Sequence, residues 1–225
     1  MIYQKQQQAF IQSNQSGFTI IESLVAIVVV GILLAAIAPI IVLSVATRVQ
    51  ARRVELATDA AKTYIDGVRS RTIPPPPITD TTDRSGNYPA PTVGNLTCNT
   101  ANTYCSAPAT NLYCVDGDAD GSGCTMSSIR DLVIQAFRRN ISSIAPQDDY
   151  QLGIRIYRAD GFATDGTNLL EKAPNKQLIF TGRVGDRKAP LLETTTEISS
   201  KVTTFSDFCA RLKPLHSNPN PQSNC

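Results

Sequence analysis

Histidine and tryptophan are nearly absent from this chain of 225 residues. It has no tryptophan and one histidine, His216, which lies in a segment rich in proline and asparagine. Catalysis by a Ser/His/Asp or Cys/His arrangement needs a histidine held in a cleft. A zinc site usually needs ligands at short spacing, and the sequence has no Cys-x-x-Cys pair. We therefore expect neither an enzyme nor a zinc protein.

A strong excess of charge of either sign is also lacking. The chain has 21 Lys and Arg residues and 19 Asp and Glu residues, which gives a net charge of +2. Nucleic-acid-binding proteins usually concentrate positive charge on one face or segment. The composition therefore indicates no nucleic-acid partner.

Charge is missing altogether from residues 23–47, a run of 25 residues. A helix that rises ~1.5 Å per residue makes this run about 37 Å long, enough to cross a hydrocarbon core of about 30 Å with some tilt. Glu22 comes directly before the run. A carboxylate at the edge of such a segment is costly, so Glu22 is predicted to be functional and to need a partner.

The residues around Glu22 resemble the cleavage and methylation motif of type IV pilin-like proteins. The matching segment is Ser16-Gly17-Phe18-Thr19-Ile20-Ile21-Glu22-Ser23-Leu24-Val25-Ala26. The resemblance implies that a prepilin peptidase cuts after Gly17 and removes a leader of residues 1–17. It implies that the new N-terminal residue, Phe18, is methylated. It also implies that the Phe18 amino group pairs with Glu22 during assembly.

A secretory signal and a plain membrane anchor each account for less of this pattern. A secretory signal would place its apolar core before the cleavage site and lose it, whereas here the removed piece is mostly polar. A plain membrane anchor accounts for the apolar run but not for Glu22. The positive-inside rule alone would put Arg48, Arg52 and Arg53 in the cytoplasm. The resemblance implies the opposite: a cytoplasmic leader, a single pass through the inner membrane and an exported head.

The helix is expected to continue beyond the membrane, because an apolar stripe with helical spacing follows the uncharged run. Its members are Val54, Ala57, Ala61, Tyr64, Ile65 and Val68. Gly31 and Pro39 fall where the family often loosens the helix, and the four prolines at 74–77 end it. The predicted regions are a leader (1–17), the transmembrane and assembly half of a helix of about 50 residues (18–47), its amphipathic half (48–73) and an exported globular head (74–225).

The head is predicted to hold a long surface loop and a second helix. Residues 79–111 are rich in Thr, Asn, Pro and Gly and show no period, which indicates a loop held by cross-links rather than by packing. Ser128 and Asp131 resemble a capping box, and the apolar residues that follow have helical spacing. The sequence therefore predicts a helix over residues 128–140.

Strands are predicted after that helix. Apolar residues alternate with others at Leu152, Ile154 and Ile156, which is typical of a strand. Residues 178–184 form a second candidate strand, and a third lies within 196–205. This order predicts an α+β fold in which a small antiparallel sheet packs on the long helix, as in the heads of pilin-like proteins.

Six cysteines all lie in the predicted exported part: Cys98, Cys105, Cys114, Cys124, Cys209 and Cys225. An even number of cysteines in an oxidising compartment predicts up to three disulfides, for which 15 pairings are possible. Proximity in the sequence favours Cys98–Cys105, Cys114–Cys124 and Cys209–Cys225. Reduced, inert thiols are the alternative.

Asp116, Asp118 and Asp120, followed by Gly121, match the first half of an EF-hand calcium loop. Position twelve is Ser127 rather than a bidentate glutamate, so the pattern is incomplete. Some pseudopilins carry a structural calcium in the head, which favours the metal. The alternative is an ordinary Asp- and Gly-rich turn.

Two classes of function fit this sequence. The first is a structural subunit, a minor pilin or pseudopilin of a type IV pilus-like or type II secretion-like filament that supports secretion or motility. Its partners would be other pilin-like subunits, prepilin peptidase, membrane lipid, and an inner-membrane assembly platform with its ATPase. The prolines at 74–77, the cysteine-rich loop and residues 204–209 resemble the pseudopilins of cyanobacterial hormogonium polysaccharide secretion. The second class is a membrane-anchored protein that binds calcium or a glycan without polymerising.

Overall fold

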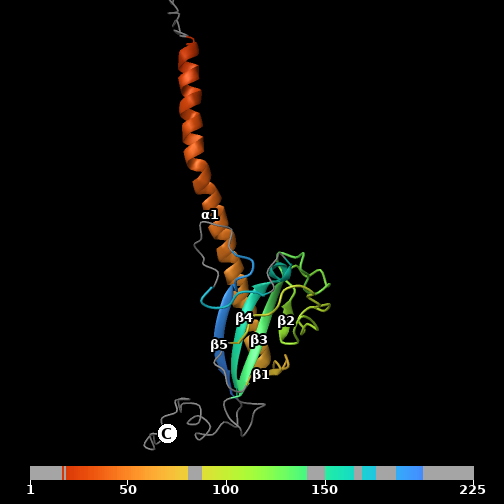
Figure 1. Ribbon diagram of the computed structural model, residues 1–225. Helices are drawn as coiled ribbons and strands as arrows, with labels where there is room; N and C mark the ends of the chain where they lie inside the picture. The colour runs from red at the N-terminus through yellow and green to blue at the C-terminus, as the bar shows by residue number, and fades with distance from the viewer. Residues whose placement is uncertain are drawn as a thin grey trace, which may run out of the picture. The chain divides into compact units, whose positions relative to one another are not determined.

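The computed structural model describes Gly17 and residues 19–80, 88–140, 150–164, 169–175 and 186–199, without the side chains of 78–80 and 139–140. The chain divides into two compact units, residues 1–45 and residues 46–225. One helix, α1 (Ile20–Arg69), begins in the first unit and ends in the second (Figure 1). Its 50 residues confirm the predicted length.

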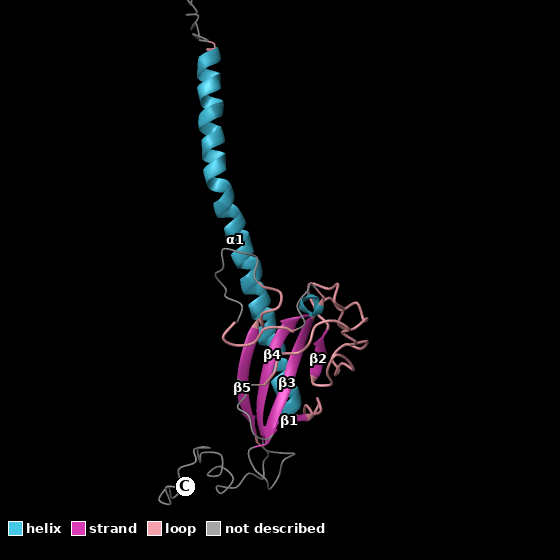
Figure 2. Cartoon of the chain, in the orientation of Figure 1, coloured by secondary structure: helices cyan, strands magenta, loops and turns pink. Residues whose placement is uncertain are grey.

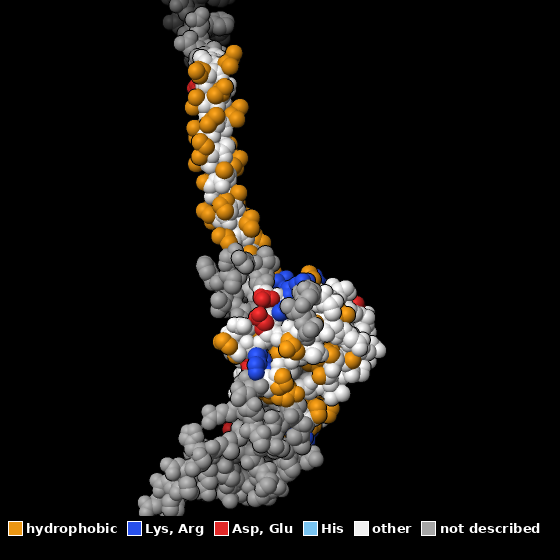
Figure 3. Space-filling model, in the orientation of Figure 1, with side chains coloured by type: hydrophobic (Ala, Val, Ile, Leu, Met, Phe, Trp, Pro, Cys, Tyr) orange, Lys and Arg blue, Asp and Glu red, His pale blue; other side chains and the backbone are white. Residues whose placement is uncertain are grey.

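In the first unit, α1 runs through Gly31 and Pro39 without a break. Pro39 was expected to loosen the helix without ending it, and the helix does continue. All side chains from Ile20 to Ser44 are exposed, and Figure 3 shows hydrophobic side chains along the length of this segment. Its large apolar side chains are between 46% and 88% exposed.

In the second unit, the rest of α1 packs on a sheet in which the structure describes five strands. The strands are β1 (Ile78–Asp80), β2 (Leu112–Val115), β3 (Leu132–Asn140), β4 (Tyr150–Arg158) and β5 (Leu192–Ile198). β3, β4 and β5 are antiparallel neighbours, and the other edge of β3 pairs with β2 and β1. Only β1 pairs in parallel among these described strands. The structure thus confirms a pilin-like α+β fold (Figure 2).

The sheet separates two apolar cores. On one face, Ala57, Ala61 and Tyr64 of α1 pack with a cluster that includes Ile134 of β3 and Ile154 of β4. The predicted amphipathic stripe therefore lies on the sheet. The second core joins the opposite side of β3 and β4 to the cysteine-rich loop and to the 3₁₀ helix η1 (Ala159–Phe162).

The predicted helix over 128–140 is wrong, because this segment holds the central strand β3. Ile134 is in the core under α1, whereas Val133 is in the core under the cysteine-rich loop. A strand buried on both faces has an almost continuous apolar sequence, which matches helical spacing as well as it matches a strand. The capping-box bond does form, since the Asp131 backbone N–H donates to Ser128 Oγ at 3.2 Å. Here that bond closes a turn before a strand.

The other predicted head elements had mixed outcomes. β4 confirms the strand at Leu152, Ile154 and Ile156. The strand predicted within 196–205 corresponds to the end of β5, which begins earlier, at Leu192. Residues 178–184 lie outside the described residues. The loop at 79–111 is packed as well as cross-linked, because Cys98 and Cys105 belong to the second core.

Candidate functional site

The start of α1 carries the predicted processing and assembly residues. Gly17 is exposed, and Phe18 lies outside the described residues. Thr19 caps the helix, since its Oγ1 accepts a hydrogen bond from the Glu22 backbone N–H at 3.3 Å. Its carbonyl oxygen accepts another from the Ser23 N–H at 3.2 Å. Thr19 and Glu22 have the spacing of a capping box, which favours a helix that begins beside the cleavage junction.

The Glu22 carboxylate has no hydrogen-bond or ion-pair partner among the described residues, and the side chain is exposed. The residues after it present apolar side chains on every side of the helix. A helix that is apolar all round is stable only in lipid or against other apolar surfaces. Among the described residues, α1 alone is long and apolar enough to cross a membrane, judged by length and composition.

Residues 12–38 match the family model of the prokaryotic N-terminal methylation motif. The start of the chain therefore carries the N-terminal motif of type IV pilin-like proteins. The match includes the Gly17–Phe18 junction and Glu22, so it covers the residues that carry the resemblance in the sequence. No curated protein and no solved structure matches the chain.

The motif indicates a structural protein rather than an enzyme, and it implies prepilin peptidase and pilin assembly partners in general. Together with the apolar half of α1, it fits a single-pass anchor in the inner membrane.

Among the described residues, two disulfides cross-link the head. Cys98 pairs with Cys105 and Cys114 pairs with Cys124, with Cα–Cα distances of 4.3 and 5.7 Å. Both pairs confirm the prediction made from proximity. All four cysteines are buried in the second core. The predicted Cys209–Cys225 pair lies outside the described residues.

The Cys114–Cys124 disulfide closes the loop that contains Asp116, Asp118 and Asp120. One carboxylate oxygen from each of the three lies within 4.8 Å of those of the other two. Asp116 accepts hydrogen bonds from the backbone N–H groups of Ala119 at 2.7 Å and Gly121 at 3.3 Å. Ala119 and Gly121 both have positive φ, which bends the loop around the carboxylates.

These three residues supply hard oxygen ligands, which suit calcium. The Ser122 hydroxyl, and then its backbone N–H, donate to Asp120 and lower the pKa of that carboxyl, which favours its charged form. Ser127, at position twelve, bonds the Thr125 hydroxyl at 3.2 Å and adds no carboxylate. The residues therefore fit the first half of a calcium loop and leave its bidentate ligand unsupplied.

Asp131 has a role that the sequence did not reveal. Its carboxylate is buried and accepts hydrogen bonds from the backbone N–H groups of Gly117 at 3.2 Å and Thr125 at 3.0 Å. These two contacts hold both ends of the loop that contains Asp116, Asp118 and Asp120, which we call the Asp loop. The capping-box pattern had identified Asp131, but for a helix terminus rather than for this loop.

Proposed function

We propose that this protein is a minor pilin or pseudopilin, a structural subunit of a type IV pilus-like or type II secretion-like filament. The observation that carries the proposal is the first unit of the chain. It combines an apolar surface on all sides of α1 with a charged Glu22 that has no partner among the described residues. Lipid alone would satisfy the apolar side chains but not the carboxylate.

Assembly supplies the missing partner. After cleavage behind Gly17, each subunit has a positively charged amine on Phe18, and this amine pairs with Glu22 of a neighbouring subunit. Such a pair gains strength in a medium of low dielectric constant. A helix that slipped along its neighbour would leave one charge unpaired, so the pair also fixes the axial register of the filament.

The wider setting follows from the same proposal. The leader is cytoplasmic and the head is exported, and an inner-membrane platform with its ATPase extracts the mature subunit from the bilayer. The filament supports secretion or motility. Polysaccharide is the proposed cargo, on the resemblance to the cyanobacterial pseudopilins that the prolines at 74–77 and the cysteine-rich loop support.

The alternative function is an anchored protein that binds calcium or a glycan through its head and does not polymerise. The specific observation in its favour is the cross-linked Asp loop. In either case, the loop is proposed to hold a structural calcium ion through Asp116, Asp118 and Asp120, with Cys114–Cys124 and Asp131 keeping the carboxylates together.

Replacement of Glu22 separates the two functions. Glu22→Leu removes the charge and should leave membrane insertion intact while abolishing incorporation into filaments. Glu55→Gln is the matched control, because Glu55 is an exposed glutamate of the same helix that pairs only with nearby Arg52 among the described residues, at 2.7 Å. The measurement is the amount of each variant in sheared filaments and in membranes. If Glu22→Leu enters filaments as well as Glu55→Gln does, the anchored binding protein becomes the better conclusion.

A further inference from the structure

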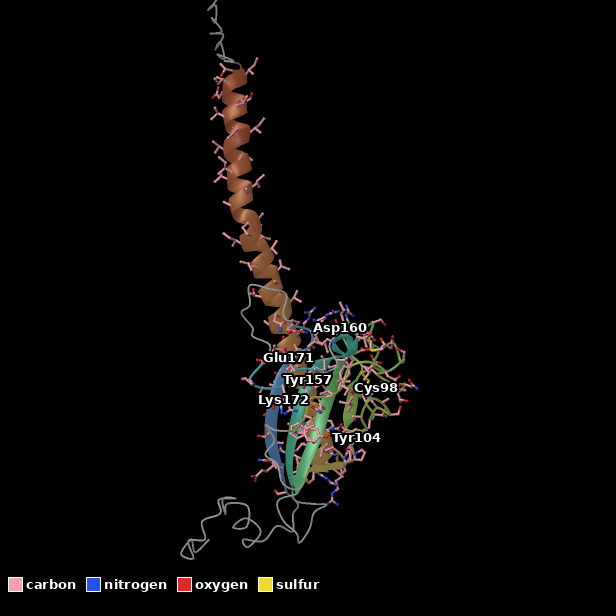
Figure 4. The ribbon with its side chains drawn as sticks, viewed as in Figure 1. Cys98, Tyr104, Tyr157, Asp160, Glu171 and Lys172 are labelled. Carbon is pink, nitrogen blue, oxygen red and sulfur yellow. A yellow bond between two sulfur atoms is a disulfide. The ribbon has the colours of Figure 1, made fainter. Side chains whose placement is uncertain are left out.

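A pocket in the second unit gathers five arginines. Its volume is about 390 Å³, and it is lined by Arg48, Val49, Arg52, Arg53, Leu56, Ile129, Arg130, Leu132 and Arg158. The lining comes from the part of α1 that follows the uncharged run, from the turn before β3 and the first residue of β3, and from the end of β4. Figure 3 shows Lys and Arg side chains gathered beside α1 at one end of the sheet, and Figure 4 places Asp160 at the same end.

The arginines of this pocket outnumber the carboxylates that pair with them. Arg52 pairs with Glu55 at 2.7 Å, and Arg158 pairs with Asp160. Arg48, Arg53 and Arg130 form no ion pair with any described residue. Burial, and then repulsion from Arg158, lower the pKa of Arg53, and the attraction to Asp160 offsets these two effects only in part. An anion in the pocket would relieve that repulsion.

The deepest of these arginines also has an unused donor. Arg158 is 5% exposed, and its Nε makes no hydrogen bond with any described residue. A buried donor without a partner is destabilising, and proteins rarely leave one unsatisfied. An oxyanion with several acceptor oxygens is the chemistry that a group of guanidinium donors recognises best.

We propose that this pocket binds the phosphate of an anionic phospholipid headgroup. Arg48 directly follows residue 47, the last of the uncharged run, and α1 is continuous across this point. Arg48–Arg53 therefore spans about 8 Å of helix beyond that run, which matches the ~5–7 Å depth of the headgroup layer on each side of the hydrocarbon core. The apolar side chains of Val49, Leu56 and Ile129, which are 44%, 42% and 63% exposed, suit the glycerol and upper acyl chain of a lipid.

The same proposal accounts for the departure of these arginines from the positive-inside pattern. Arg48, Arg52 and Arg53 would depart from the positive-inside rule on an exported flank. If they form a lipid site with Arg130 and Arg158, they hold the head against the outer leaflet before the subunit is extracted. This inference rests on the proposed membrane anchor but not on assembly into filaments. The Glu22→Leu experiment tests assembly, so either proposal can fail without the other.

The test is retention of lipid by the mature full chain in detergent, measured by native mass spectrometry with phosphatidylglycerol, phosphatidylcholine or inorganic phosphate. The wild type should retain phosphatidylglycerol in preference to phosphatidylcholine. Arg53→Gln and Arg130→Gln should each reduce that preference about fivefold, the equivalent of ~1 kcal/mol for one basic residue near a membrane surface. Lys62→Gln is the control, because Lys62 is an exposed cation of α1 outside the pocket.

Arg130 makes the experiment decisive, because it reaches the pocket from the turn before β3 rather than from α1. If Arg130→Gln retains phosphatidylglycerol as well as Lys62→Gln does, the pocket is not the site. If inorganic phosphate at the same concentration as phosphatidylglycerol removes that lipid from the protein, the pocket binds a free anion. The lipid proposal is then overturned. Unchanged melting temperatures in phosphatidylcholine would show that the variants remain folded.

Discussion

Arg155 and Glu193 are directly opposed register partners on β4 and β5, and their side chains form an ion pair with Nε and Oε1 3.0 Å apart. The Arg155 side chain is fully buried, and its Nη1 donates to the Tyr88 carbonyl oxygen at 2.7 Å. The other Glu193 oxygen accepts from the Ala173 backbone N–H at 3.1 Å. One pair thus connects the sheet to two loops that have little regular structure of their own.

This pair should be essential to the stability of the head. Glu193→Ala removes the carboxylate that balances the buried Arg155 charge, and breaking a buried ion pair in this way typically costs about 3–5 kcal/mol. Asp59→Ala is the control, because the Asp59–Lys62 pair is 3.8 Å long and exposed, and such pairs contribute under about 1 kcal/mol. Denaturant unfolding of the mature chain in detergent, followed by circular dichroism, measures both. Equal losses in the two variants would contradict the role given to Arg155.

The two disulfides should be present in protein taken from the cell envelope. Each closes a short loop, with sequence separations of 7 and 10 residues, and should stabilise the head by about 2–3 kcal/mol by restricting the unfolded chain. Non-reducing peptide mapping should recover Cys98 with Cys105 and Cys114 with Cys124. Free thiols at these positions, or a Cys114→Ser/Cys124→Ser variant as stable as the wild type, would refute the prediction.

Calcium should stabilise the oxidised protein if the Asp loop binds it. At a concentration 100 times the dissociation constant, a ligand adds about 2.7 kcal/mol to the free energy of unfolding, which appears as a higher melting temperature. Asp118→Asn should lose this response, because it removes one of the three negative charges. The asparagine keeps an oxygen that can accept the hydrogen bond from the Ser128 hydroxyl, which is 2.8 Å long in the wild type. Asp66→Asn, on α1, should respond like the wild type. No rise in the wild type would exclude the calcium site.

Short-range patterns in the sequence predicted much of this structure. The alternation at Leu152, Ile154 and Ile156 predicted β4, because β4 has one strongly apolar face toward α1. The two confirmed disulfides join cysteines that are neighbours in the sequence, so closing their loops costs little entropy. In each case the information lies within about ten residues.

Long-range features could not be predicted in this way. The sequence of β3 matches helical spacing because two cores, one on each face, need apolar residues at neighbouring positions. The partner of Arg155 depends on the β4–β5 register, which no local pattern specifies. The arginine pocket likewise joins α1 to Arg130 and Arg158, which are far from it in the sequence. The one sign of the pocket in the sequence was the position of Arg48, Arg52 and Arg53. They follow the uncharged run on the side that is expected to be exported, against the positive-inside rule.

Maturation should leave Phe18 as the N-terminal residue, because the motif that matches residues 12–38 contains the Gly17–Phe18 junction. Gly17 is exposed, and no described residue has an atom within 4 Å of the position of a Cβ there, so a larger residue should act on the peptidase rather than on the fold. Gly17→Val should therefore block cleavage, whereas Gln15→Ala, in the same leader, should be cleaved normally. Mass spectrometry of membrane-extracted protein, from a host with the peptidase, should find a methylated Phe18 terminus in the wild type and in Gln15→Ala. Leader-bearing wild-type protein as the main species would show that the motif is not processed, and the pairing of the Phe18 amine with Glu22 would then have no chemical basis.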